Sequence, residues 1–272
     1  MIIDKIYTKY SVLKSKATSK ARLHKAMVSL SEIVKGKDCF VLGSSPTPSL
    51  ERFNKNMSLV CVNGSSIIAD KLNIPPPIMT VVDFELLDVN INRSKPARSA
   101  IIKNELLNDL DLGFIVSSQS NTSPGGHPDE LKAKYSGFIS LYKSDCRKII
   151  HQATGVSNLE NDVHGMLSRG MFSIGLCFWL GASSVTFSGF SLTRKNKNES
   201  TYFYGDVTNN IKIPDVEYKS LEDWDTRAHS MADCQLLGQL SLNGHKVYSD
   251  SKEFIPLLQN WGHVPPDWAK RN

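Results

Sequence analysis

The sequence lacks long apolar runs, a secretion signal and a cysteine framework. No apolar stretch in the 272-residue chain reaches the ~18 residues that are needed to cross a bilayer. The N-terminal stretch contains an acid, Asp4, and too short an apolar segment for a signal peptide, so we expect a cytoplasmic protein. The cysteines include no C-x-x-C pair, which predicts reduced packing residues and no zinc site.

The basic residues are unevenly distributed, although none forms the aromatic-interleaved patch that is typical of nucleic-acid binding. The net charge is +5, and no acid lies between Asp4 and Glu32. This segment is compatible with peripheral contact to an anionic inner membrane or to a phosphorylated partner. A solvated basic helix explains it equally well. Its basic residues are Lys5, Lys9, Lys14, Lys16, Lys20, Arg22 and Lys25.

Composition and length are those of an ordinary globular protein. Hydrophobic residues make up 40% of the chain and charged residues 22%, and this length suits one domain with an insertion. Helical spacing over residues 11–35 ends at Lys35-Gly36-Lys37. We predict a basic N-terminal helical segment at 1–36, a main domain at 37–260 and a C-terminal tail at 261–272.

Three apolar runs in the first third of the chain predict buried strands, at residues 39–42, 58–62 and 78–82. Each run is followed by small or polar residues: Gly43-Ser44-Ser45, Asn63-Gly64 and Asp83. Parallel winding would bring all three ends to one edge of the sheet, where ligands bind in open α/β folds. Gly43 alone is also compatible with a plain strand-to-helix turn.

The second half of the chain predicts another unit of this kind. Ser168-Arg169-Gly170 opens an apolar helix over 171–180, and a strand at 184–187 ends at Ser188-Gly189-Phe190-Ser191. The start of such a helix favours an anion, but Gly170 would equally allow close packing of helix and sheet.

The remaining segments are assigned with less detail. We predict a helix at 99–110, a strand at 113–117, a helix from Arg227 through Leu240 and a strand at 246–249, and leave 135–150 unassigned. The polar, aromatic-bearing stretch at about 192–226 suggests a lid, with a surface loop as the alternative. The predicted class is α/β, with a mostly parallel sheet and helices on both faces.

The order of these motifs resembles the bacterial sialyltransferases of the Campylobacter type. The resemblance spans roughly residues 39–248 and ends with His-Ser opening a helix at His229. It implies a Rossmann-like fold of the GT-A-like variant with a lid, a CMP-activated sugar as donor, and neither metal nor other cofactor. The implied partners are the CMP-sugar and a glycan or glycolipid acceptor of the bacterial surface, such as lipopolysaccharide or capsule, and a homo-oligomer stays open.

The resemblance also assigns site residues, with departures from the family pattern. His229 resembles the catalytic histidine, and a histidine suits removal of a proton from an acceptor hydroxyl. Thr47-Pro48 is an insertion, while Asp83, Arg169 and Thr193 replace an asparagine, a serine and a tyrosine of the family. We therefore leave the acid sugar open as sialic acid, Kdo or a related nonulosonate. The implied substrate-binding residues are Gly43, Ser44, Ser45, Asn63, Gly64, Asp83, Ser168, Arg169, Gly170, Gly189, Phe190, Ser191, Thr193, Tyr202 and Tyr204.

Several other functions are compatible with parts of the pattern. A metal-dependent GT-A transferase would use a D-x-D pair, and Asp109-Leu110-Asp111 and Asp223-Trp224-Asp225 match that pattern. A dehydrogenase is disfavoured because the turn at Gly43 is not G-x-G-x-x-G and Asn63 stands where an acid is expected. A methyltransferase, a pyrophosphokinase-like enzyme and a non-catalytic binding module stay open.

Overall fold

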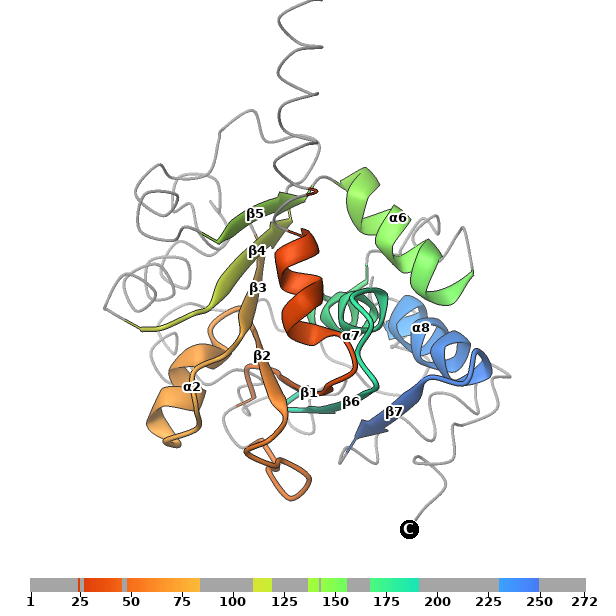
Figure 1. The fold of residues 1–272 in the computed structure, drawn as a ribbon. Coiled ribbons are helices and arrows are strands. Elements are labelled where there is room, and N and C mark those ends of the chain that lie inside the picture. The colour runs from red at the N-terminus through yellow and green to blue at the C-terminus, as the bar shows by residue number, and fades with distance from the viewer. Residues whose placement is uncertain are drawn as a thin grey trace, which may run out of the picture.

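A sheet of seven strands organises the chain in the computed structural model (Figure 1). The structure describes residues 24, 27–45, 48–83, 110–118, 137–141, 143–155, 167–190 and 230–249. The strands are β1 (Asp38–Leu42), β2 (Ser58–Val62), β3 (Met79–Asp83), β4 (Phe114–Ser118), β5 (Phe138–Leu141), β6 (Ser184–Ser188) and β7 (Lys246–Ser249). The helices are α2 (Ser65–Lys71), α6 (Lys143–Thr154), α7 (Arg169–Trp179) and α8 (Ser230–Leu242), and residues 27–34 are also helical.

Every strand pair in this sheet is parallel, in the order β5-β4-β3-β2-β1-β6-β7. β1 is an interior strand between β2 and β6, and its residues 39–42 are buried, as is all of β2. Strands covered on both faces read as continuous apolar runs, which is why the sequence pattern located them. The predicted α/β, Rossmann-like class is confirmed, and the sheet is entirely parallel.

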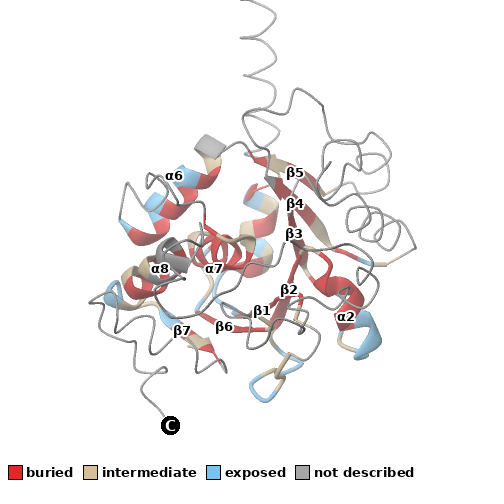
Figure 2. Cartoon of the chain, turned by 180° about the vertical axis from the view of Figure 1, so that it is seen from behind, coloured by how far each residue is buried: buried red, intermediate tan, exposed pale blue. Residues whose placement is uncertain are grey.

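Helices cover both faces of the sheet (Figures 1 and 2). On one face, residues 27–34 with α6, α7 and α8 share a large core cluster with alternate residues of the strands. On the other face, Phe40, Leu42, Leu59 and Cys61 pack with Ala69 of α2. Cys39 and Val41 belong to the first cluster, and Phe40 and Leu42 belong to the second. This follows because successive side chains of a strand point to opposite faces of the sheet.

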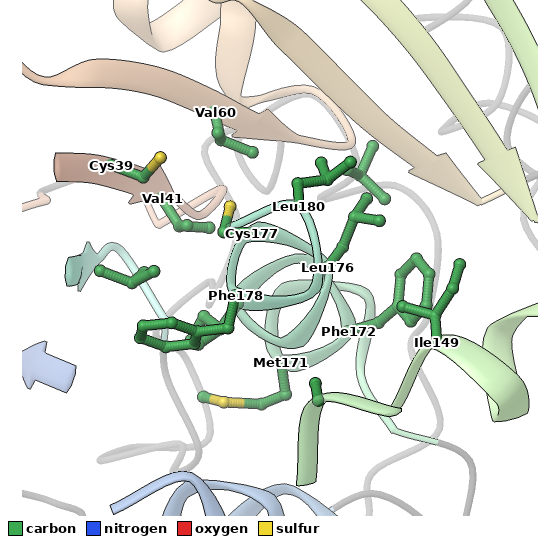
Figure 3. Packing of buried hydrophobic residues seen from close by; sticks show 14 of the residues in the cluster. Cys39, Val41, Val60, Ile149, Met171, Phe172, Leu176, Cys177, Phe178 and Leu180 are labelled. Atoms are coloured by element: carbon green, nitrogen blue, oxygen red, sulfur yellow. The ribbon is translucent and has the colours of Figure 1, made fainter. Parts of the chain in front are cut away.

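Helix α7 is the central element of the larger face. In Figure 3, Cys177 points toward Cys39 and Val41 of β1, and Phe172 lies beside Ile149 of α6. Trp179 Nε1 donates a hydrogen bond to Gln152 Oε1 of α6 at 2.7 Å. Ser31 Oγ donates to Leu180 O at 3.2 Å, which joins the helical residues 27–34 to the end of α7.

The part of the N-terminal segment that the structure describes belongs to this core. Met27, Leu30 and Val34 are buried in it, and Gly36 N donates to Gly181 O at 2.8 Å. The helix expected to end at residue 35 therefore has a buried stripe facing the sheet. The domain boundaries expected at 36–37 and 260–261 stay predictions.

The elements differ from the sequence prediction mainly at their ends. The fourth strand begins at Phe114 because Gly113 has φ +58°, outside the extended region. The unassigned stretch 135–150 contains β5 and the start of α6. Of the expected helix at 99–110, the structure describes only Leu110, which is not helical; residues 99–109, the lid at about 192–226 and residues 227–229 lie outside the described residues.

The cysteines match their predicted packing role where the structure describes them. Cys39, Cys61, Cys146 and Cys177 are buried and take part in no disulfide. Burial raises the pKa of Cys61 to about 12, against the opposing effect of a hydrogen bond with Ser65. Contact with Cys39 and burial raise the pKa of Cys177. Within the described ranges, no helix is both long and apolar enough to traverse a bilayer.

Candidate functional site

The strand order reverses beside β1. From β1 the chain builds β2, β3, β4 and β5 outward on one side, and then returns to place β6 and β7 on the other side. In open parallel sheets, ligands bind at the carboxyl edge beside such a switch point. The residues after Leu42 and Ser188 therefore define the candidate site.

Two glycines meet where β1 and β6 end. Gly43 N donates to Ser188 O at 2.8 Å, and Ser45 N donates to Gly189 O at 3.0 Å. A Cβ on Gly43 would lie 2.3 Å from Gly189 O, and Gly189 itself has φ +77°. A side chain at residue 43 would therefore push the backbones of the two loops apart.

Gly170 has an equally specific neighbour at the start of α7. A Cβ there would lie 1.9 Å from Cε1 of Phe190, whose half-buried ring also packs edge-to-face on Phe187 with centroids 5.6 Å apart. The close-packing interpretation of Gly170 is thus supported, with a side chain from the β6 loop as the packing partner. This contact joins the start of α7 to the ends of β6 and β1.

Ser168 is the N-cap of α7, as its side chain accepts a hydrogen bond from Met171 N at 3.2 Å. Its own N–H donates to Asp233 Oδ1 of α8 at 2.8 Å. Two of the N–H groups that a helix leaves without intrahelical partners are thus taken by the chain itself. Arg169 follows in the first turn and is half-buried.

Asp233 is a buried acid, 1% exposed, in the first turn of α8. Burial raises its pKa to about 7, while hydrogen bonds with Ser168 act in the opposite direction. Near neutral pH, both the protonated and the ionised carboxyl are therefore populated in the folded protein.

The turn after β2 is held by a serine. Asn63 has φ +54°, a conformation that asparagine tolerates better than most residues. Ser65 Oγ accepts from Val62 N and donates to Leu42 O, both at 2.7 Å. The buried Ser65 hydroxyl thus ties the carboxyl ends of β2 and β1 together.

The structure brings most of the described site residues to one edge. Gly43, Ser44, Ser45, Gly189 and Phe190 lie at the ends of β1 and β6, and Ser168, Arg169 and Gly170 join them through the start of α7. Asn63 and Gly64 follow β2, and Asp83 ends β3, one strand further out. His229, Ser191, Thr193, Tyr202 and Tyr204 lie outside the described residues, as do Pro46 and Thr47.

The D-x-D alternatives have a different location. Asp111 lies before β4, at the amino edge of the sheet, where its Oδ1 accepts from Gly113 N at 3.1 Å. Asp109 and the pair at 223–225 lie outside the described ranges. Among the residues that the structure describes, no three His, Cys, Asp or Glu side chains are grouped as metal ligands.

Sequence reasoning missed two residues that hold this edge together. Ser65 follows an Asn-Gly pair and reads as an ordinary turn residue, although serine after a strand end is a common local cap. Asp233 reads as a normal acid at a helix start. Its position four residues after His229 in an otherwise uncharged helix is the signal that could have drawn attention to it.

The fold and the loops at its switch point define an α/β protein of Rossmann-like type. The structure is similar to the monofunctional α-2,3-sialyltransferase Cst-I from Campylobacter jejuni, with a TM-score of 0.51 and 15% identity over 87% of this chain and 82% of that one. It is also similar to the C. jejuni sialyltransferase CstII, solved with cytidine 5′-monophosphate, with a TM-score of 0.51 and 14% identity over 86% of this chain and 87% of that one. The sequence matches no protein-family model and no curated protein.

Proposed function

We propose that the protein is a metal-independent, inverting glycosyltransferase that moves a 2-keto-3-deoxy acid sugar from a CMP donor to a glycan of the bacterial surface. The observation that carries this proposal is the meeting of three motif segments at the β1–β6 switch point. Residues 43–45, 168–170 and 189–190 lie together there, in a fold similar to that of two sialyltransferases.

The proposed chemistry needs two groups at this edge. A base takes the proton from the acceptor hydroxyl as it attacks the anomeric carbon, and CMP leaves with the bonding electrons. His229 is the proposed base, and Arg169 is the proposed partner of an anionic donor group, since a guanidinium binds carboxylate or phosphate in a bidentate manner. Tyr202 and Tyr204 are the proposed donors to the leaving phosphate.

A ligand screen by thermal unfolding tests this proposal. The protein is heated with CTP, CMP, CMP-sialic acid, CMP-Kdo, UDP-sugars or S-adenosylmethionine. A ligand present at a hundred times its dissociation constant stabilises by about 2.7 kcal/mol, which corresponds to a Tm shift of about 5 °C or more in a protein of this size. We expect this shift with cytidine nucleotides only.

Other outcomes of the screen would point elsewhere. Stabilisation by S-adenosylmethionine alone would favour a methyltransferase, and stabilisation by UDP-sugars that EDTA abolishes would favour the metal-dependent alternative. The absence of any shift with a cytidine nucleotide would refute the proposal.

We further propose that the basic residues between Lys5 and Lys25 hold the enzyme at the cytoplasmic face of the inner membrane, close to a glycolipid acceptor. Each such residue near an anionic surface contributes roughly 1 kcal/mol of binding. Co-sedimentation with vesicles tests this: binding to vesicles containing phosphatidylglycerol, but not to purely zwitterionic ones, is expected. Equal binding to both would contradict an electrostatic contact.

A further inference from the structure

The carboxyl group of Asp233 lies directly beside the candidate site but has no role in the proposed transfer. It is buried, and its Oδ1 lies 2.8 Å from Ser168 N, at the cap of α7. The same cap residue precedes Arg169 and Gly170, and Gly170 packs on Phe190 of the β6 loop. Asp233 is thus separated from the switch point by a single turn of helix.

The charge on this carboxyl group is poorly compensated by its surroundings. Burial favours the protonated form, and the hydrogen bonds from Ser168 favour the ionised one. The ionisable residues of the elements that pack against α8 are Arg169 and Cys177 of α7, Lys143, Asp145, Cys146, Arg147, Lys148 and His151 of α6, and Lys246 and Tyr248 of β7. Arg147, Lys148, His151 and Lys246 are exposed to solvent, which screens their effect on a buried acid.

An anionic donor at the switch point would bring a second negative charge close to Asp233. Two like charges in a partly desolvated site disfavour each other, so the ionised carboxyl weakens binding of the anion and the bound anion weakens ionisation of the carboxyl. Linkage makes these two effects equal in free energy.

We propose that Asp233 couples donor binding to proton uptake: the anionic CMP-sugar binds to the form in which Asp233 is protonated, and ionisation of Asp233 promotes its release. Asp233 is in this view a positioning residue that acts through Ser168 and the first turn of α7. This inference rests on the proposed function, because it takes the switch point as the site of the CMP-sugar.

The coupling has a measurable size. With a carboxyl that titrates near pH 7 in the free protein and stays protonated in the complex, affinity falls about 25-fold between pH 6.5 and 8.5. At pH 7.5, binding then takes up roughly three-quarters of a proton per site. The phosphodiester and the carboxylate of CMP-sialic acid stay ionised over this range, so the uptake comes from the protein.

Calorimetric titration of the full chain with CMP-sialic acid tests the proposal, in two buffers that differ in ionisation enthalpy and at several pH values. We expect proton uptake and the loss of affinity by about 25-fold in the unaltered protein, and neither in Asp233→Asn. The asparagine keeps the size and the Oδ1 acceptor for Ser168 N but does not titrate. If this variant fails to fold, the same titration of His229→Ala decides: uptake that persists there excludes this histidine as its source and supports Asp233, and loss of the uptake overturns the coupling.

The outcomes separate the two proposals. Binding of CMP-sialic acid without proton uptake, or with the same uptake in Asp233→Asn, overturns the coupling and leaves the proposed function standing. Failure of CMP-sialic acid and of CMP to bind at any pH overturns the proposed function, and the coupling with it.

Discussion

The contact between Gly170 and Phe190 gives a quantitative prediction for Gly170→Ala. The new Cβ would lie 1.9 Å from Cε1 and 2.5 Å from Cδ1 of the Phe190 ring, whereas carbon atoms in contact prefer about 3.5–4 Å. The ring must therefore move by more than an ångström, out of its edge-to-face contact with Phe187.

The expected magnitude combines three effects. Forcing extra volume into a packed site costs about 1–3 kcal/mol, and losing an aromatic pair costs about 0.5–1.5 kcal/mol. Alanine gains up to about 1 kcal/mol over glycine within a helix. We expect Gly170→Ala to lower the free energy of unfolding by about 1–3 kcal/mol as the sum of these effects.

A double-mutant cycle with Phe190→Ala isolates the contact. Once the ring is removed, Gly170→Ala should be neutral or stabilising by up to about 1 kcal/mol, so the coupling energy should be about 1–4 kcal/mol. Gly175→Ala is the matched control in the same helix, since its Cβ would meet Ile150 Cδ1, the end of a side chain that can rotate away.

Urea unfolding of the four proteins in the cycle and of the control measures these quantities. Two results together would refute the view that the Phe190 ring requires glycine at residue 170. The stability losses of Gly170→Ala and Phe190→Ala would add in the double variant, and Gly170→Ala would be as stable as Gly175→Ala.

Three further predictions concern other parts of the chain. His229→Ala should lower kcat by about 10²–10⁴-fold if His229 is the base. His24→Ala, at an exposed histidine, should leave kcat unchanged. If both substitutions changed kcat equally in steady-state assays, His229 would not be the base. Ser65→Ala should destabilise by about 1–3 kcal/mol because Val62 N and Leu42 O lose a buried partner. Ser66→Ala is the control and should leave stability nearly unchanged, since Ser66 Oγ has no hydrogen-bond partner in the described structure. If both substitutions lowered the free energy of unfolding equally in urea, the Ser65 hydroxyl would not be what joins β1 and β2. Hydrogen bonds from Ser183 and Ser184 lower the pKa of Asp38. The ionised Asp38 therefore contributes to the free energy of unfolding above about pH 4, and this contribution is lost at lower pH. Asp38→Asn should flatten the acid side of the curve of stability against pH, and an unchanged curve would argue against a stabilising role of the Asp38 carboxylate.

The strands were predictable because each has a strong local signal. Buried parallel strands read as apolar runs, and small residues such as Gly43 mark their ends. Ser168-Arg169-Gly170 was expected to open an apolar helix over 171–180, and in the structure Ser168 is the N-cap of α7. The stretch 135–150 was not assignable because a four-residue strand, β5, is followed almost at once by α6, so neither period extends over a full window.

The parts of the site that sequence could not predict depend on contacts between distant segments. Glycine at residue 170 suits both an anion site and close packing, and only the position of Phe190 distinguishes them. Asp233 is ordinary as a first-turn acid, and becomes unusual only because it is buried beside Ser168 at the cap of α7. Such effects come from tertiary structure and leave no local pattern in the chain.

The position of β1 between β2 and β6 has a consequence for how the protein is made. β1 pairs with β2 early in the chain, but its other edge is covered only when β6 arrives, at Ser184–Ser188. Until then, an apolar strand presents unpaired backbone groups, a condition that favours association between chains. The Gly43–Gly189 contact also waits for that pairing, so a nascent chain has no assembled switch point until β6 has been synthesised and docked. We therefore expect this protein to depend most on chaperones while translation is paused before residue 184.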